Sequence, residues 1–238
     1  MKKSHSLIFP GLLLRGRLLK RYKRFLADIE LEDGALITAH CPNSGAMQGL
    51  TTSGTPVWVS RSSNPSRKLP YTWQMAEVDG TFVGMNTSNP NDLVEYAILG
   101  GVIQELQGFQ TLRREVGYGQ NSRIDILLEN PSEPLTYVEV KNVHLKRGKT
   151  AAFPSSVTAR GAKHMRELSE MVRQGHRAYI VYVVQRNDCE GFELAADIDP
   201  LYEAECRKAF ENGVQPLVYA CEVTPQAITI THRLNFNF

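Results

Sequence analysis

The sequence lacks the cysteine pairs and clusters that stabilise disulfide-rich and zinc-binding domains. Only four of its 238 residues are cysteines, and Cys41, Cys189, Cys206 and Cys221 stand far apart, without a CxxC pair or a cluster of histidines. This spacing argues against a disulfide scaffold and against a zinc module. Unpaired thiols are typical of the reducing cytosol, so we expect a cytoplasmic protein.

Long hydrophobic runs are also missing. No apolar segment approaches the roughly 18 to 20 residues that a membrane-spanning helix needs. The start of the chain, MKKSHSLIFPGLLLRGR, imitates a secretory signal, but Pro10 and Gly11 interrupt its apolar run and Arg15 ends it. No small-x-small cleavage pattern follows. We therefore expect this segment to enter the fold as a strand, and we expect no contact with a membrane.

Neither sign of charge dominates, because the net charge is only +2. A composition that is 42% hydrophobic and 22% charged is ordinary for a globular protein. Six basic residues nevertheless fall within ten positions that contain no acid, namely Arg15, Arg17, Lys20, Arg21, Lys23 and Arg24. Such a run can bind phosphate groups. A solvated edge strand, whose charges prevent aggregation, is the alternative.

The first third of the chain has the pattern of a small β-structure. From residue 12 to about residue 83, short strand-like segments alternate with turns such as Asp33-Gly34 and Pro42-Asn43-Ser44-Gly45. No helical period of any length occurs there. We predict an N-terminal OB-like β-barrel of five strands over residues 1–84.

The pattern changes at Asn89. Pro90 suits the first position of a helix, and apolar residues at helical spacing predict a helix over residues 90–107. Strands are expected at 112–117, 123–128 and 136–143, a helix at 158–174, and a strand covered on both faces at 178–184. A helix at 201–212 and strands at 217–222 and 228–231 follow. This order predicts a mixed-sheet α/β domain over residues 85–238, and hence a two-domain α/β (α+β) fold.

Two of these strands carry charges that buried strands rarely tolerate. Asp125 lies in SRIDILLE, and Glu139 and Lys141 lie in TYVEVKNV. Because side chains alternate along a strand, Glu139 and Lys141 share a face, and pairing of the two strands can add Asp125. Two carboxylates offer oxygen ligands for Mg²⁺ or Mn²⁺, and the lysine can orient water or neutralise phosphate charge. The alternative is a half-exposed strand pair in which Lys141 only neutralises an acid.

Other charged residues extend this candidate site. Glu95, on the preceding helix, is a further candidate metal ligand and catalytic acid, although the helix dipole favours a carboxylate there without any such role. Residues 141–173 hold eight basic residues and two acids, which is typical of contact with a nucleic-acid backbone but also of a solvated helix face. The residues that we predict to contact nucleic acid are Arg21, Lys23, Arg24, Arg123, Arg160, Lys163 and His164.

Two weaker signals lie in the first region. Aromatic residues accompany basic ones there, namely Tyr22, Phe25, Trp58, Tyr71 and Trp73. This composition resembles a single-strand binding surface, with core packing as the alternative. The neighbours His40 and Cys41 could suggest a thiol nucleophile, but adjacent residues on a strand face opposite ways.

Several strings resemble one known family. RYKRFLAD, HCPNSGAM, SRID, YVEVKNV and FPSSVTARGAKHMREL occur in this order over most of the chain. Together they resemble the sugar fermentation stimulation protein A family. The resemblance implies an OB-like domain followed by a domain similar to PD-(D/E)xK nucleases, with the nuclease-like site at Asp125, Glu139 and Lys141 and with Glu95 as the helix acid.

The resemblance also implies a function. It implies DNA binding of low sequence specificity and a role in regulating sugar (maltose) metabolism in bacteria. Our leading hypothesis is therefore Mg²⁺-dependent phosphodiester hydrolysis. The alternatives are a non-catalytic DNA-binding regulator and a metal-dependent phosphodiesterase or sensor for a small nucleotide. One departure concerns Ser155, which stands after Phe153-Pro154 where the family commonly has Asp.

Overall fold

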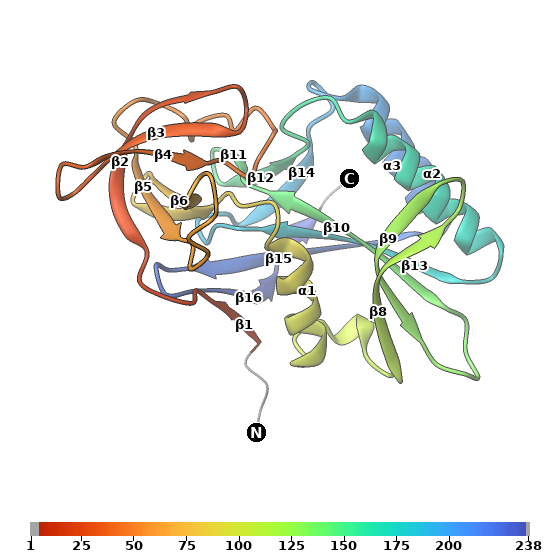
Figure 1. Cartoon of the computed structure of the whole chain (residues 1–238). Helices are drawn as coiled ribbons and strands as arrows, with labels where there is room; N and C mark the ends of the chain where they lie inside the picture. The colour runs from red at the N-terminus through yellow and green to blue at the C-terminus, as the bar shows by residue number, and fades with distance from the viewer. Residues whose placement is uncertain (1–4, 237–238) are drawn as a thin grey trace.

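The N-terminal part of the chain is a closed five-stranded barrel. The computed structural model describes residues 5–236. The barrel strands are β2 (Leu14–Tyr22), β3 (Leu26–Leu31), β4 (Leu36–His40), β5 (Pro56–Arg61) and β6 (Tyr71–Val78), and a β4–β6 pairing closes the ring. A hairpin adds β7 (Thr81–Gly84) beside β6. Figure 1 shows this barrel in red to yellow. The predicted OB-like barrel is confirmed.

Strand alternation fills the barrel interior with apolar side chains. Leu18, Ile29, Val57 and Trp73 are fully buried in one cluster that draws on all five barrel strands. The indole of Trp73 donates to the carbonyl of Met75 at 2.9 Å, so its one polar group is satisfied. The barrel therefore has a hydrophobic core of its own.

The remainder of the chain is built on a seven-stranded mixed sheet, in the order β1-β16-β15-β13-β10-β9-β8. Its strands are β1 (Ser6–Ile8), β8 (Thr111–Tyr118), β9 (Ser122–Glu129), β10 (Thr136–Val143), β13 (Arg177–Val184), β15 (Gln215–Val223) and β16 (Ala227–Arg233). Only β10, β13 and β15 are parallel neighbours. The mixed sheet that we predicted is confirmed, and Ser6–Ile8 join it as the edge strand β1.

Helices cover both faces of this sheet, as Figure 1 shows. The helix α1 (Pro90–Leu99) packs on one face, against β1, β16 and β10. The helices α2 (Ala159–Arg173) and α3 (Pro200–Glu211) pack together on the other face. Central strand β13 is buried at every position after Arg177, which confirms a strand covered on both faces. Within residues 5–236, no helix is long and apolar enough to cross a membrane.

The structure corrects one predicted element and adds four. The helix predicted over residues 90–107 ends at Leu99, because Gly100 and Gly101 follow and Gly101 has φ +72°; residues Gln104–Leu106 form a separate 3₁₀ turn. A small sheet of β11 (Leu145–Arg147), β12 (Thr150–Phe153), β14 (Gly191–Leu194) and β17 (Asn235–Phe236) was not predicted. Its strands have two to four residues, which is too short for a recognisable period.

Gly16, in β2, provides a test of the barrel. A Cβ at this position would lie 2.6 Å from the carbonyl oxygen of Glu30 and 2.7 Å from a methyl carbon of Ile29. We expect Gly16→Ala to destabilise the barrel by about 1–3 kcal/mol, because the clash involves backbone that cannot move freely. Urea unfolding followed by tryptophan fluorescence measures this, since both tryptophans lie on barrel strands. The control is Gly11→Ala, where nothing lies within 4 Å of the added atom. Equal midpoints for the two variants would contradict the prediction.

Candidate metal centre

Asp125 sits where two paired strands separate. The pairing of β9 with β10 ends at Ile126 and Val138. Beyond that point the N–H of Val140 donates to Asp125 Oδ2 at 2.7 Å instead of to a main-chain carbonyl. The other oxygen of Asp125 accepts from the side-chain amide of Asn91, on α1, at 2.9 Å. Both oxygens are thus held, and the carboxylate is fixed at the split.

Glu139 lies next along β10 and is only 2% exposed. Lys141 donates from Nζ to Glu139 Oε1 at 2.5 Å, so the two side chains share a face of the strand. His164, on α2, contacts the same oxygen through Nδ1. Oε2 of Glu139 is buried and has no hydrogen-bond partner among the described residues. One carboxylate oxygen is therefore free to bind a ligand.

The electrostatics of the two carboxylates are coupled. Burial, and then the negative charge of Glu139, raise the pKa of Asp125 above its ordinary value, although the N–H of Val140 and Lys141 act against this. Burial also opposes ionisation of Glu139, but Lys141 and His164 outweigh it and lower its pKa. Two neighbouring carboxylates repel each other when both are ionised. A cation bound between them would stabilise both in the ionised form.

These residues fit a divalent cation that keeps part of its water shell. Within residues 5–236, no group of three or more His, Cys, Asp and Glu side chains is placed to hold a metal. A site here would therefore rest on Asp125 and Glu139, with the free Oε2 as one donor. Mg²⁺ is commonly bound in this way, through one or two carboxylates with several waters retained.

Glu95 does not join the two carboxylates. Its oxygen Oε2 lies 3.3 Å from Arg114, on β8, which also binds Asp92. Asn91, one helical turn before Glu95, is the residue through which α1 reaches Asp125. At Asp125, α1 thus supplies the amide of Asn91, whereas the sequence predicted the carboxylate of Glu95.

The predicted basic residues of α2 divide into two sets. Arg160 donates from Nε to Nε2 of His164 at 3.2 Å, so both side chains lie on the Glu139 side of the helix. Lys163 points elsewhere and donates to the carbonyl of Gln120 at 2.7 Å. His164, which we predicted to contact nucleic acid, is buried and has Glu139 as its partner.

The predicted basic residues of the barrel lie at one turn. Lys23 and Arg24 are exposed between β2 and β3. Arg21 instead holds the turn together, because its Nη2 donates to the carbonyls of Arg24, Asn43 and Gly45 at 2.9, 2.7 and 3.0 Å. The guanidinium of Arg21 is therefore largely occupied by backbone.

Two further residues named from the sequence have partners other than the carboxylates. Arg123 is exposed and donates from Nη1 to the carbonyl of Glu115 at 3.4 Å. Ser155 faces the barrel, since a Cβ added to Gly45 would lie 3.5 Å from its Oγ. Ser155, the position at which the sequence departs from the family resemblance, therefore lies beside the barrel loop that contains Gly45.

Tyr118 is a neighbour of the carboxylates that the sequence did not reveal. Its hydroxyl is buried without a hydrogen-bond partner among residues 5–236. Burial, followed by the charges of Glu139, Glu167 and Asp125, raises its pKa. Neither Tyr118 nor Asn91 stands in a recognisable motif, because each reaches the site through tertiary packing alone.

The cysteine considered as a nucleophile is unsuited to that role. Cys41 is fully buried in the barrel core, and burial raises the pKa of its thiol. A thiol that stays protonated is a poor nucleophile.

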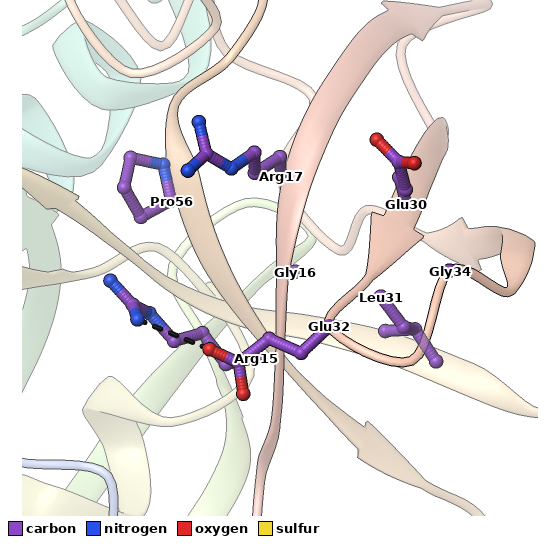
Figure 2. A pocket seen from close by; sticks show the side chains of 8 residues that line it. All are labelled: Arg15, Gly16, Arg17, Glu30, Leu31, Glu32, Gly34 and Pro56. Atoms are coloured by element: carbon purple, nitrogen blue, oxygen red, sulfur yellow. Dashed lines mark hydrogen bonds and ion pairs between the residues drawn. The ribbon is translucent and has the colours of Figure 1, made fainter.

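A separate groove on the barrel has a volume of about 400 Å³ and is shown in Figure 2. Arg15, within it, donates to Glu32 at 3.1 Å. Its lining residues are Arg15, Gly16, Arg17, Glu30, Leu31, Glu32, Gly34 and Pro56. The groove contains none of the residues described above at the carboxylates. Two arginines and two glutamates line it, so their charges cancel.

Two sequence families match the chain, one for each region. The family described as "SfsA N-terminal OB domain" matches residues 19–85, and the family described as "Sugar fermentation stimulation protein RE domain" matches residues 88–227. A sugar fermentation stimulation protein homolog of Rhodospirillum centenum is 56% identical over 96% of this chain and 99% of its own length. The homolog of Maricaulis maris is 54% identical over 94% and 96%.

A solved structure has the same fold. It is described as Pyrococcus furiosus SfsA in complex with Ca²⁺, and it matches with a TM-score of 0.89 at 23% identity over 98% of both chains. The matches to both sequence families cover most of the chain, and its identity to the curated homologs exceeds one half. This chain belongs to the sugar fermentation stimulation protein family.

Proposed function

We propose that this chain binds DNA with low sequence specificity and hydrolyses phosphodiester bonds with the help of Mg²⁺ or Mn²⁺. The observation that carries the proposal is the pair formed by Asp125, fixed on the N–H of Val140, and Glu139, whose Oε2 is buried and free. The Pyrococcus furiosus relative, whose description includes Ca²⁺, supports a divalent cation.

Each residue of the centre has a defined part in this proposal. Asp125 and Glu139 hold the cation, and Asn91 orients Asp125. When bound, the cation would stabilise charge on the phosphate and lower the pKa of a water. Lys141, at 2.5 Å from Glu139, is within reach of a water or phosphate oxygen beside that carboxylate. Glu95 is left outside the centre, since it pairs with Arg114.

DNA contact in this proposal comes from exposed basic residues that meet phosphates. Lys23 and Arg24 stand on the barrel turn, and Arg160 stands on α2 beside His164. Contacts to the phosphate backbone carry no sequence information, so low specificity follows. Action on DNA implies the bacterial cytosol, and four free, buried thiols suit that reducing compartment.

A second candidate is a DNA-binding regulator that performs no chemistry. It is favoured by the ion pair at Glu139, where Lys141 neutralises the acid without a metal and His164 contacts the same oxygen, Oε1. The names of the homologs, which refer to stimulation of sugar fermentation, fit a regulator of sugar metabolism. Maltose is the sugar that the family resemblance implies.

Removing the charge of Asp125 tests catalysis. We expect Asp125→Asn to reduce nicking of plasmid DNA in Mg²⁺ or Mn²⁺ by about 10³-fold or more, because metal stabilisation of phosphate charge supplies several kcal/mol. Gel analysis of supercoiled plasmid measures this. The matched control is Glu129→Gln on the same strand, whose carboxylate pairs with Arg113 at 3.0 Å. Cleavage that survives Asp125→Asn, or that needs no metal, would sink the proposal.

Metal binding can be tested without any reaction. We expect Mn²⁺ at about 100 times its dissociation constant to raise the free energy of unfolding by about 2.7 kcal/mol, because it binds only the folded chain. Denaturant titration with and without Mn²⁺ measures the gain. Asp125→Asn and Glu139→Gln should each lose it, whereas Glu129→Gln should keep it. A gain retained by all three variants would place the metal elsewhere.

The salt dependence of binding tests the DNA surface for both candidates. We expect Arg160→Ala to weaken binding of a duplex regardless of its sequence, and to lower the slope of log affinity against log salt by about one. Arg173→Ala on the same helix, where Arg173 pairs with Glu170 at 2.6 Å, should leave the slope unchanged. Salt-dependent binding without cleavage in Mg²⁺ or Mn²⁺ would select the regulator. An unchanged slope for Arg160→Ala would remove α2 from the DNA surface.

A further inference from the structure

We propose that the turn between β2 and β3 is a stacking platform for an unpaired nucleotide base, and that single-stranded DNA is therefore the substrate class of the metal centre. This inference rests on the proposed function and deepens it. The feature that carries it is Phe25, which is 49% exposed between the exposed cations of Lys23 and Arg24 on one side and β3 on the other.

Tyr22 and Tyr71 are half-buried, the latter against the barrel core, and both tryptophans are buried, whereas the ring of Phe25 is exposed. Within residues 5–236 it pairs with no other ring and no cation. The ring of Tyr22 already lies under Lys20 at 5.3 Å, and its hydroxyl donates to Asp28 at 3.1 Å. Phe25 is therefore the barrel ring left to meet a ligand.

The turn is rigid before any ligand arrives. Lys23 and Arg24 have φ of +48° and +63°, which makes the chain reverse tightly after Tyr22. Arg21 bonds to the carbonyl of Arg24 and also to those of Asn43 and Gly45, in the neighbouring loop. A binding surface that is already ordered loses less conformational entropy when it binds.

Two observations place this turn on the side of the barrel that faces the segment before α2 (Figure 1). The loop that Arg21 holds reaches Ser155, since a Cβ on Gly45 would lie 3.5 Å from Ser155 Oγ. Ser155 precedes α2, whose His164 contacts Glu139. In Figure 1 the β2–β3 turn lies at the end of the barrel that faces the segment before α2. A chain bound at Phe25 can therefore continue along the segment before α2, the helix whose His164 contacts Glu139.

The segment before α2 carries an exposed apolar residue as well. Val157, two residues after Ser155, is 73% exposed. An aromatic ring and an aliphatic side chain, each bordered by cations such as Arg24 and Arg160, match a ligand with flat apolar groups and a negative backbone.

The chemistry of Phe25 selects single strands over duplexes. In a duplex the faces of the bases cover one another, and only their edges are accessible in the grooves. A ring can stack on a base only when that base is unpaired. Duplex DNA can meet Lys23 and Arg24 through its phosphates but offers Phe25 no partner.

Comparison of Phe25→Ala on two substrates tests this inference. We expect the variant to lose roughly 5- to 150-fold in affinity for a labelled oligothymidylate, which is the effect of one lost base stack. Affinity for a labelled duplex of the same length should stay within about twofold. Fluorescence anisotropy of the full-length protein in EDTA, where no strand is cut, gives both values at one salt concentration.

Three variants separate stacking from other effects. Phe25→Leu should lose affinity although it keeps an apolar side chain, and Phe25→Trp should keep it. Bound oligothymidylate should quench the fluorescence of the introduced indole. Both native tryptophans are buried, so this quenching reports on position 25. The control is Leu36→Ala at the start of β4, where an equally isolated apolar residue is 72% exposed. Equal losses for Phe25→Leu and Phe25→Trp, or equal losses on single strand and duplex, would overturn the inference.

Failure of this inference is distinguishable from failure of the proposed function. If the protein binds and nicks duplex DNA while Phe25→Ala leaves oligothymidylate binding unchanged, the platform is wrong and the metal centre stands. If the native protein binds neither oligonucleotide at low salt, the proposed function fails, and the inference fails with it.

Discussion

The candidate centre depends on one hydrogen bond, from the N–H of Val140 to Asp125. Where β9 and β10 separate, this N–H would lose its partner, and a buried donor without a partner is costly. The carboxylate of Asp125 replaces the missing carbonyl, so the split in the sheet and the position of the acid require each other. Asn91 then ties the same carboxylate to α1. The side chain of Asp125 thus connects β9, β10 and α1.

Glu139 imposes a second constraint, because an almost fully buried acid must be compensated. Lys141 on its own strand and His164 on α2 provide that compensation and keep its pKa low. Removing either partner would leave a buried charge partly uncompensated, which is usually far more destabilising than losing a surface ion pair. The side chain of Thr158 caps α2 by accepting from the N–H of Gly161 and so fixes where the helix begins. The acid thus couples α2 to the sheet, and the residues suited to metal binding are also structural.

The separation of two contacting residues along the chain decides whether the sequence alone could predict their contact. Alternation along one strand predicted that Glu139 and Lys141 share a face, because that relation is local. The same reasoning extended a helix to residue 107, since apolar spacing continues past the glycines that end it at Leu99. Asn91 lies 34 residues from Asp125, and His164 lies 25 from Glu139. Contacts at such separations are set by packing of elements, which no local period encodes.

Main-chain hydrogen bonds join the barrel to the sheet. The N–H of Gly84, at the end of the barrel, donates to the carbonyl of Gln185 at 2.8 Å, and the N–H of Gln185 donates to that of Val143 at 3.0 Å. Any side chain at Gly84 would collide with that of Gln185. Backbone bonds therefore link the barrel to the end of β10, the strand that carries Glu139 and Lys141. The carboxylates lie on paired strands, whereas Phe25 lies on an exposed turn. Since turns tolerate substitution better than paired strands, the residues of the β2–β3 turn can change in this fold without disturbing the carboxylates.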